Sequence, residues 1–393
     1  MRIELGTGMF GGGIAAPLAL APSTLNRMSN SGAQSTHTYA ASGGSGSYTY
    51  SLAVNNSGGS IDSSSGLYTC GTIELGNQVD TVRVTDTWGS HVDVTVTVYP
   101  KLAIYNGSLS PAAAGQYTFT PGGGSATGYV WSINTATNST INPSTGFYWA
   151  GDVPTSVDNI TLTDSLGFQV IVDATIGVFR GEAIGTPIAI YDTRYGTTIV
   201  GGSKISAWVD QSGTGDSNKN LAQATSANQP VWTASNANYN NQASISCTTA
   251  DRWLQGAGLW ASAQAQPFTV YVVGQISSGV IVDMVNSQIL QYGPNWAYFA
   301  GAAFKQGTTY TTRNIVAVVF DGASSAQYGN GDMTTPAVSG DAGSGSATRV
   351  SVGATGSGGS NYEVCAIFVY SGHHDATTRG RIRTQLHNLF GVP

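Results

Sequence analysis

The segment YEVCAIFVY at residues 362–370 closes a ladder of short apolar segments that occupies the last third of the chain. The ladder begins near Ile188 and carries the segment WVDQSG at residues 208–213 close to its start. Later members, such as residues 268–273 and 315–320, are almost continuously apolar. Short runs rich in Val, Ile, Tyr and Phe predict strands. We therefore predict a β domain over residues 181–393.

One helix is expected directly after the closing strand. Its apolar residues recur at a spacing that places them on one helical face: Ile382, Leu386, Leu389 and Phe390. Asp375 can cap the start of this helix, and Gly391 is typical of a helix end. Three arginines of the helix are expected to point away from the sandwich: Arg379, Arg381 and Arg383.

The composition favours a secreted or particle-bound β protein. The 393 residues suffice for two to four domains of about 100–200 residues each. Hydrophobic residues make up 41% of the chain, but only 9% are charged, against about 25% in an average soluble protein. Solubility must therefore come from Ser, Thr, Asn, Gln and Gly, which is unusual for a cytosolic enzyme.

The same composition disfavours several classes of function. The net charge is −6 and no basic cluster occurs, so nucleic-acid binding is not expected. No apolar run reaches the length of about 18 residues that a membrane span requires. Cys70, Cys247 and Cys365 lie far apart and form no CxxC pair, so we expect buried thiols rather than a disulfide framework or a metal site.

Residues 1–35 are interpreted as an extended anchoring arm, because Gly, Ala, Ser, Asn and Pro dominate them without a sustained period. The apolar run at residues 14–21 is a weak signal-peptide core, since Glu4 offsets Arg2 and glycines precede the run, and we expect no cleavage. The segment GTGMFG at residues 6–11 matches the dinucleotide pattern GxGxxG. No helix is expected after it, so we expect no such cofactor.

Residues 36–180 contain an internal repeat of nearly 80 residues. The segment IDSSSGLY at 61–68 matches INPSTGFY at 141–148, and DTVRVTDTWG at 80–89 matches DNITLTDSLG at 158–167. In VDVTVTV at 92–98 every second side chain is valine, as in a half-buried strand. Two small β-sandwich modules are therefore predicted, over residues 36–100 and 101–180.

Each module carries a D-x-x-G corner that predicts a hairpin turn in which the Asp side chain caps its own backbone. These aspartates are Asp86 and Asp164. A calcium site is the disfavoured alternative, because one carboxylate per turn is too few for an ion that takes about 6–8 oxygen ligands. Trp88 at the first turn would be a contact candidate if it faced solvent, but packing on the adjacent module is the simpler expectation.

The two modules resemble bacterial immunoglobulin-like domains, through the pattern ID..SGLYT.G......D.V.VTD..G....V.VTV over most of residues 36–178. In that family such domains are mostly spacers or adhesive modules. A domain of about 65 residues buries only about 60% of its unfolded surface, so it is marginal alone. We therefore expect each module to stack on its neighbours.

The C-terminal domain resembles the concanavalin A-like lectin/glucanase family, also called the laminin-G-like jelly roll. Over about 200 residues the resemblance is carried by an ordered set of segments: WVDQSG at 208–213, QPVW at 229–232, DG at 321–322, NG at 330–331, RVSVG at 349–353 and the closing strand with its short helix. It implies a jelly-roll β-sandwich, so the whole chain is expected to be all-β.

Catalytic residues are not expected. Glycoside hydrolases of this family use paired carboxylates on one strand, and retaining enzymes need two carboxyls about 5–5.5 Å apart. Glu363 is the only glutamate after Glu182, and no two aspartates of this domain are two residues apart. His373 and His374 with Asp375 could form a metal or acid–base cluster, but the capping role of Asp375 favours a structural interpretation. We expect no metal and no cofactor.

Aromatic residues are the remaining candidates for ligand binding, because aromatic faces stack on sugar rings and nearby Asn side chains bind hydroxyls. The alternative for these residues is core packing, as expected for Trp208 and Trp232. The candidate glycan-binding residues are Trp253, Trp260, Tyr292, Asn295, Trp296 and Tyr298.

The arm, the tandem modules and the lectin-like domain of low charge together resemble bacteriophage proteins of the virion surface, such as a capsid decoration protein, a head fibre or a tail component. The resemblance implies a non-enzymatic structural protein and a homo-oligomer. Its arm would bind other virion proteins, and its C-terminal domain would face outward and bind host cell-surface glycan. Two alternatives stay open: a bacterial surface adhesin or secreted carbohydrate-binding protein, and a glycan-cleaving enzyme. No nucleic-acid or membrane partner is expected.

Overall fold

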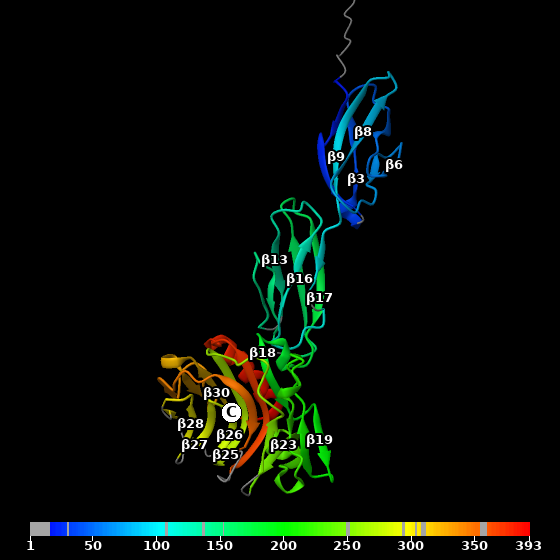
Figure 1. Ribbon diagram of the computed structural model, residues 1–393. Helices are drawn as coiled ribbons and strands as arrows, with labels where there is room; N and C mark the ends of the chain where they lie inside the picture. Colours follow the sequence, from blue (N-terminus) through cyan, green and yellow to red (C-terminus); the bar gives the residue numbers. More distant parts are fainter. Residues whose placement is uncertain are drawn as a thin grey trace, which may run out of the picture.

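The computed structural model describes residues 16–29, 31–106, 109–135, 138–151, 153–248, 252–292, 295–302, 305–307, 312–353 and 360–393. Three β domains follow one another along one long axis, with the largest at the C-terminal end (Figure 1). We call them module 1 (from residue 16 to 99), module 2 (from residue 102 to 177) and the lobe (from residue 179 to 393). In this part of the chain α1 (Ala376–Phe390) is the single α-helix, and no helix is both long and apolar enough to cross a membrane. The predicted all-β class with one short terminal helix is confirmed.

Module 1 is a sandwich of two small sheets. The larger sheet has the strand order β2-β9-β8-β5, the smaller has the order β3-β7-β6, and β1 pairs with β4. Val94, Val96 and Val98 of β9 point into its core together with Tyr68, as the alternating pattern predicts. The strands are β1 (Ala19–Ala21), β2 (Thr24–Met28), β3 (Thr36–Thr38), β4 (Ala40–Ser42), β5 (Tyr48–Val54), β6 (Ser60–Ile61), β7 (Leu67–Thr69), β8 (Gln78–Asp86) and β9 (His91–Tyr99).

Residues 16–29 and 31–35 belong to module 1 and not to an arm. Strand β1 pairs with β4, and β2 runs parallel to β9. Leu20 is buried in the core of module 1, and Leu18 and Leu25 pack against it. The predicted end of the arm at residue 35 is therefore wrong, because these short apolar segments find their strand partners only in the folded module. The rest of the predicted arm, residues 1–15, lies outside the described residues.

Module 2 repeats this architecture, with sheets β13-β16-β17 and β11-β15-β14 and the pair β10–β12. The parallel pairing of module 1 recurs as a bridge between Ala112 and Gly177. The repeat therefore begins earlier than predicted, since LALA at 18–21 corresponds to LAIY at 102–105. The strands are β10 (Ala103–Tyr105), β11 (Gln116–Thr118), β12 (Thr120–Gly122), β13 (Val130–Asn134), β14 (Thr140–Ile141), β15 (Phe147–Trp149), β16 (Val157–Thr163) and β17 (Gln169–Thr175).

The hairpin aspartates cap their turns, as predicted. The Asp86 carboxylate accepts hydrogen bonds from the backbone N–H groups of Trp88 and Ser90, each at 3.0 Å, and Asp164 makes the same two contacts in module 2. Trp88 is 68% exposed, so the expectation that it packs on the adjacent module is wrong. Its turn lies at the end of β8 and β9 opposite Tyr99, which contacts Phe168 of module 2.

The lobe is a flattened, nearly closed ladder that forms two stacked sheets. Sheet A contains β31, β30, β25 and β34, with β18 and β23 sharing the far edge of β34; sheet B contains β20, β21, β24, β33, β26, β27 and β28. The strands are β18 (Pro187–Asp192), β19 (Thr197–Val200), β20 (Lys204–Trp208), β21 (Leu221–Ala222), β22 (Val231–Asn236), β23 (Gln242–Cys247), β24 (Leu254–Gly256), β25 (Phe268–Ser278), β26 (Val280–Val285), β27 (Gln288–Tyr292), β28 (Asn295–Phe299), β29 (Lys305–Gln306), β30 (Asn314–Phe320), β31 (Ala326–Tyr328), β32 (Val338–Ser339), β33 (Ala347–Val352) and β34 (Asn361–Ser371).

The central strands of sheet A are buried on both faces, which explains their continuous apolar sequence. Val270 of β25 and Val369 of β34 face the sandwich core that contains Trp208. Their neighbours Tyr271 and Phe368 face the opposite way, into a second core. A strand covered on one face only would alternate between apolar and polar residues.

Helix α1 covers this second core. Its residues Ile382, Leu386 and Phe390 are buried there, as predicted. The Asp375 side chain accepts a hydrogen bond from the Thr378 N–H at 2.7 Å and caps the helix. Gly391 ends the helix with a φ of 68°, a backbone conformation that favours glycine.

Arg379 does not point away from the lobe. It is only 3% exposed, and its guanidinium carbon lies 3.7 Å from the centre of the Tyr328 ring. Its Nε donates to the Met333 carbonyl at 3.0 Å. The sequence expectation was wrong for this residue because a long arginine side chain can bury its stem and still find an aromatic face and carbonyl partners.

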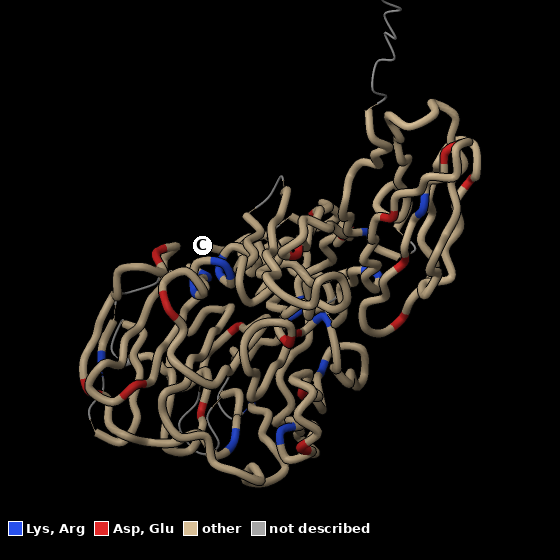
Figure 2. The backbone as a smooth tube through the Cα atoms, turned by 90° about the horizontal axis from the view of Figure 1, so that it is seen from above, with Lys and Arg blue, Asp and Glu red and all other residues tan. Residues whose placement is uncertain are grey.

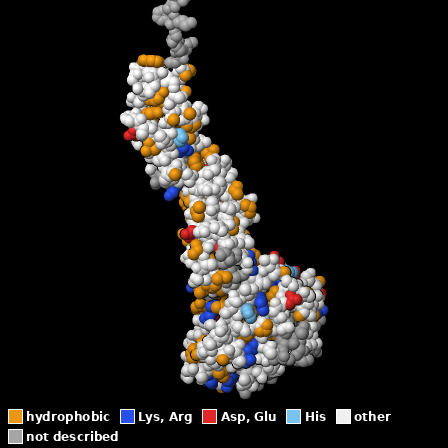
Figure 3. Space-filling model, turned by 180° about the vertical axis from the view of Figure 1, so that it is seen from behind, with side chains coloured by type: hydrophobic (Ala, Val, Ile, Leu, Met, Phe, Trp, Pro, Cys, Tyr) orange, Lys and Arg blue, Asp and Glu red, His pale blue; other side chains and the backbone are white. Residues whose placement is uncertain are grey.

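Each junction between domains buries residues of one domain in the core of the next. Met28 of module 1 belongs to the core of module 2, and its Sδ accepts a hydrogen bond from the Leu102 N–H at 3.0 Å. Ala113 and Ile176 of module 2 and the following Phe179 join the core under α1. The expected stacking of the modules on their neighbours is confirmed, and Figure 3 shows them as a slender stalk attached to the wider lobe.

Candidate functional site

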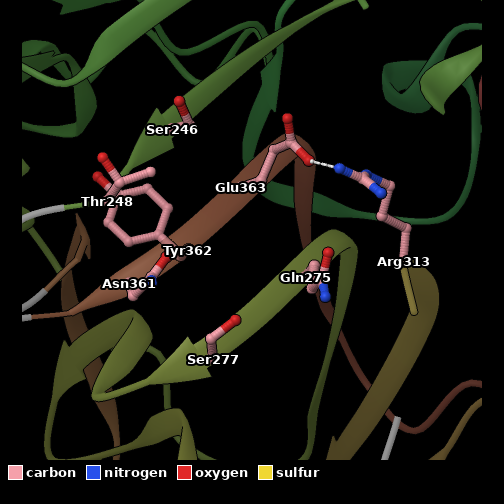
Figure 4. Close-up of a pocket in the computed structure, with 8 residues that line it drawn as sticks. All are labelled: Ser246, Thr248, Gln275, Ser277, Arg313, Asn361, Tyr362 and Glu363. Atoms are coloured by element: carbon pink, nitrogen blue, oxygen red, sulfur yellow. Dashed lines mark hydrogen bonds and ion pairs between the residues drawn. The ribbon is translucent and has the colours of Figure 1, made fainter. Parts of the chain in front are cut away.

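A polar groove lies on the outer face of sheet A, next to the part that α1 covers. Strand pairing places Ser246, Glu363 and Gln275 in one row across β23, β34 and β25. Arg313, which directly precedes β30, extends this row (Figure 4). Tyr362 and Val364 of β34 face the sandwich core. Because successive side chains of a strand point to opposite faces, Glu363 between them points outward.

Glu363 is held by donors on both of its carboxylate oxygens. Arg313 Nε donates to Oε2 at 2.8 Å, and Arg313 Nη2 lies 2.7 Å from the same oxygen. The Asn236 side-chain amide donates to Oε1 at 2.6 Å, and the same Nδ2 contacts the Ser244 hydroxyl at 2.8 Å. The carboxylate is therefore fixed in one orientation before any ligand arrives.

The connection between β22 and β23 lies beside the groove and contacts its ion pair. It contains a short 3₁₀ turn, Ala237–Tyr239, in which Asn236 caps the backbone. The Arg313 guanidinium lies 5.4 Å from the centre of the Tyr239 ring. Burial raises the pKa of Tyr239 well above its usual value, so this phenol stays neutral. The ring therefore orients Arg313 and adds no charge.

The groove encloses about 230 Å³, somewhat less than a pocket for a drug-sized ligand, which spans about 300–1,000 Å³. Among the described residues, Arg313 and Glu363 are its only charged lining residues, and the others carry hydroxyl or amide groups. The lining residues are Ser246, Thr248, Gln275, Ser277, Arg313, Asn361, Tyr362 and Glu363. Such a surface suits a small polyhydroxylated unit.

The groove offers a single carboxylate among its described lining residues. Glycoside hydrolysis by the common mechanisms uses two, about 5–5.5 Å or about 6.5–9.5 Å apart. Glu363 is moreover engaged by Arg313 and Asn236. The described geometry therefore supplies hydrogen bonding and no acid–base pair.

Three of the six sequence candidates for glycan binding lie in the sandwich core: Trp260, Trp296 and Tyr298. The exposed fractions of Trp296 and Tyr298 are 1% and 0%, and the Tyr298 hydroxyl donates to the Ser325 carbonyl at 2.9 Å. Their rings have no free face for a sugar, so the prediction is wrong for these three residues. Core packing, the alternative considered for them, is the correct interpretation.

The other three candidates do not join the groove. Trp253 is half-buried beside β24, where its backbone N–H donates to the Asn228 carbonyl at 3.1 Å. Asn295 is half-buried at the start of β28 in sheet B. The side chain of Tyr292 lies outside the described residues. None of the six belongs to the described lining of the groove.

The His373–Asp375 segment is structural, as expected. His373 Nδ1 lies 2.9 Å from an Asp321 oxygen, and His374 Nδ1 lies 2.9 Å from the Tyr271 hydroxyl. Burial lowers the pKa of His374 to about 4, so the ring is neutral at physiological pH. Among the described residues no group of three His, Cys, Asp or Glu side chains is placed to hold a metal ion.

Sequence reasoning missed the groove because its parts are distant in the chain. Asn236 and Glu363 are 127 positions apart. The one usable signal was that Glu363 interrupts the apolar segment 362–370 with a charge. A charge in a buried strand requires a partner, but the pattern could not identify Arg313 or Asn236.

The sequence matches no protein-family model, and no curated protein matches it. Solved structures give distant similarities. An intimin C-terminal fragment in complex with the intimin-binding domain of its translocated receptor has a TM-score of 0.30 and 13% identity, covering 42% of this chain and 64% of the fragment. An arabinofuranosidase has a TM-score of 0.37 and 11% identity, covering 56% of this chain and 57% of the enzyme. A Trypanosoma rangeli sialidase has a TM-score of 0.34 and 9% identity, covering 80% of this chain and 69% of the enzyme.

The chain thus spans less than two thirds of the intimin fragment and of the arabinofuranosidase. At these TM-scores the similarities support no conclusion about activity, ligand or location.

Proposed function

We propose that the protein is a non-enzymatic structural protein displayed on the surface of a bacteriophage particle, and that its lobe binds a host-surface glycan in the polar groove. The observation that carries the binding role is the groove itself. It gathers hydroxyl and amide groups from neighbouring strands around the oriented pair of Arg313 and Glu363. A sugar hydroxyl both donates and accepts hydrogen bonds, so it can use both kinds of group.

The domain order supports display of the lobe. Two stacked modules hold the lobe away from the N-terminal end of the chain, where contact with other virion proteins is proposed (Figure 1). Charged residues are few and dispersed over all three domains (Figure 2), which suits a protein among many copies in an assembly. The particle assignment itself depends on the sequence resemblance, and a homo-oligomer is part of the same proposal.

Imaging of the native assembly tests the location. We expect electron microscopy of particles to place the lobe outermost and module 1 toward the particle body. A lobe that faces inward would overturn the display role. Detection of the chain only on bacterial envelopes would favour the alternative of a bacterial surface adhesin.

A steric block tests the binding site. Ser277 lines the groove at the end of β25 and is exposed, so Ser277→Trp should fill the groove without entering the core. We expect this variant to lose binding on an oligosaccharide array. Ser132→Trp, at an exposed position of β13 in module 2, is the matched control and should bind like the unmodified chain. Release of new reducing ends from any array member, abolished by Glu363→Gln, would instead favour a glycan-cleaving enzyme.

A further inference from the structure

We infer that the groove selects neutral, hydroxyl-rich sugars and rejects sugars that carry a carboxylate. The inference rests on the proposed glycan-binding function and adds the chemical class of the ligand. It follows from the charges of the groove, from the contacts of its ion pair and from the absence of an exposed aromatic ring among its described lining residues.

Arg313 and Glu363 carry opposite charges and approach to 2.7 Å, so the described lining has no net charge. No second cation lines the groove among the described residues. Recognition of a carboxylate usually uses an arginine fork that is free to form two parallel hydrogen bonds. Here the Nε and Nη2 side of that fork is already occupied by Glu363.

A ligand carboxylate could take this side of Arg313 only by displacing Glu363. The Glu363 side chain is 19% exposed and would keep only the Asn236 amide as a partner. Leaving a largely buried charge without its counter-ion is strongly unfavourable. The pair therefore penalises acidic ligands, although it contains the arginine that would attract them.

Glu363 Oε1 keeps a lone pair beyond its contact with Asn236, so it can accept a ligand O–H. A hydrogen bond to a charged acceptor is stronger than one between neutral groups. Asn361 and Ser277 line the same groove, and their amide and hydroxyl groups can donate to ligand oxygens. The groove thus binds hydroxyls without disturbing its ion pair.

Tyr362 is the one aromatic residue in the described lining, and it is 2% exposed, with its hydroxyl donating to the Arg252 carbonyl at 3.3 Å. No ring in the described lining therefore offers a face for stacking. Hydrogen bonds that replace bonds to water contribute little net free energy each, so one groove should bind weakly. Several copies on one assembly would raise the avidity.

Matched ligand pairs test the inference. An oligosaccharide array first identifies further neutral and acidic candidate ligands. Titration calorimetry or ligand-observed NMR then compares lactose with 3′-sialyllactose, and neutral glucan and mannan tetrasaccharides with tetragalacturonate. For the unmodified chain we expect binding of one or more neutral ligands and at least about tenfold weaker binding of the acidic partners. Ser277→Trp should abolish all of this binding.

Variants of the ion pair sharpen the test. Glu363→Gln removes the charged acceptor for ligand hydroxyls, so we expect at least about tenfold weaker binding of the neutral ligand. It also leaves Arg313 without its counter-ion and free to bind a ligand carboxylate, so we expect at least about tenfold stronger binding of the acidic ligand. The double variant Arg313→Gln with Glu363→Gln restores neutrality and should lose the affinity for acidic ligands. Circular dichroism of each variant checks that the fold is retained.

The outcomes separate the two proposals. Acidic ligands that bind the unmodified chain and are blocked by Ser277→Trp would overturn the selectivity and leave the glycan-binding function standing. An array on which neither class binds would overturn the proposed function itself. A Glu363→Gln variant that folds and keeps its preference for neutral ligands would contradict the role given to the ion pair.

Discussion

The guanidinium carbon of Arg381 lies 4.2 Å from the centre of the Trp149 ring and joins α1 to β15 of module 2. The same arginine donates to the Asn138 carbonyl at 2.7 Å and to the Ala150 carbonyl at 3.2 Å. Trp149 Nε1 in turn donates to the Ala114 carbonyl at 2.9 Å. One side chain of the last helix therefore clamps the stalk to the lobe.

Arg381→Ala should loosen this clamp. The variant loses a cation–π contact worth about 0.5–2 kcal/mol and the hydrogen bonds to two carbonyls. We expect small-angle X-ray scattering to show a broader distribution of interdomain distances, and thermal unfolding of module 2 to separate from that of the lobe.

Arg83→Ala is the matched control, because Arg83 forms an exposed ion pair with Asp93 within module 1. Its scattering curve should match that of the unmodified chain. An Arg381→Ala variant with unchanged scattering and one unfolding transition would show that the apolar contacts of Phe179 and Ile176 suffice for the junction.

Tyr148→Phe should destabilise module 2 by about 1–3 kcal/mol, because it removes the donor to a buried carboxylate. The Tyr148 hydroxyl donates to Asp158 Oδ2 at 2.5 Å, and Tyr68 makes the equivalent contact with Asp80 in module 1 at 2.6 Å. Urea unfolding of the full chain measures the loss. Tyr105→Phe, at a residue that is 56% exposed, should change stability by less than about 0.5 kcal/mol. Equal effects of the two substitutions would contradict this assignment.

His374 should make the lobe sensitive to acid. Burial lowers its folded-state pKa to about 4, below the usual histidine value of about 6.5. Between these two values the unfolded chain binds a proton that the folded chain refuses, so the stability contribution is complete above about pH 6.5 and is lost as the pH falls toward 4. The loss amounts to about 3 kcal/mol over this range.

His374→Gln should flatten this dependence, since glutamine can still bond the Tyr271 hydroxyl and does not titrate. Melting temperatures measured from pH 7.5 to pH 4.5 give the comparison. His91→Gln, at an exposed position of β9, should keep the slope of the unmodified chain. Parallel slopes for all three proteins would argue that other groups control the acid response.

Leu386→Ala should destabilise the lobe by about 2–5 kcal/mol, because it opens a cavity between α1 and sheet A. Leu386 is 0% exposed, whereas Leu389 is only partly buried on the same helix. Leu389→Ala should therefore lower the free energy of unfolding clearly less, as measured by urea unfolding of both variants. Similar losses of stability for both variants would mean that α1 does not cover the second core as described.

The folding pattern was readable from sequence wherever it depended on neighbours along the chain. The valines of residues 92–98, the Asp86 and Asp164 turns and the Asp375 cap are local features, and the structure confirms each of them. The predicted end of the arm at residue 35 was wrong, because the short segment from Leu18 to Ala21 has no local pattern strong enough to predict a strand.

The candidate site was not readable in the same way. Trp296 and Tyr298 looked like exposed ligand-binding rings because an aromatic-rich strand has the same sequence whether it faces solvent or a core. Which face is covered depends on a second sheet or on α1, and these pack against the strand from elsewhere in the chain. Arg379 was misplaced for the same reason.

The sequence by itself determined the all-β class, the repeated modules, the terminal helix and the scarcity of charge, because periodicity, turn chemistry and composition act over short distances along the chain. Only the tertiary structure decided that Arg313, Asn236 and Glu363 meet in one groove and that Arg381 reaches Trp149. Those contacts join residues far apart in sequence, and their positions follow from how sheets and domains pack.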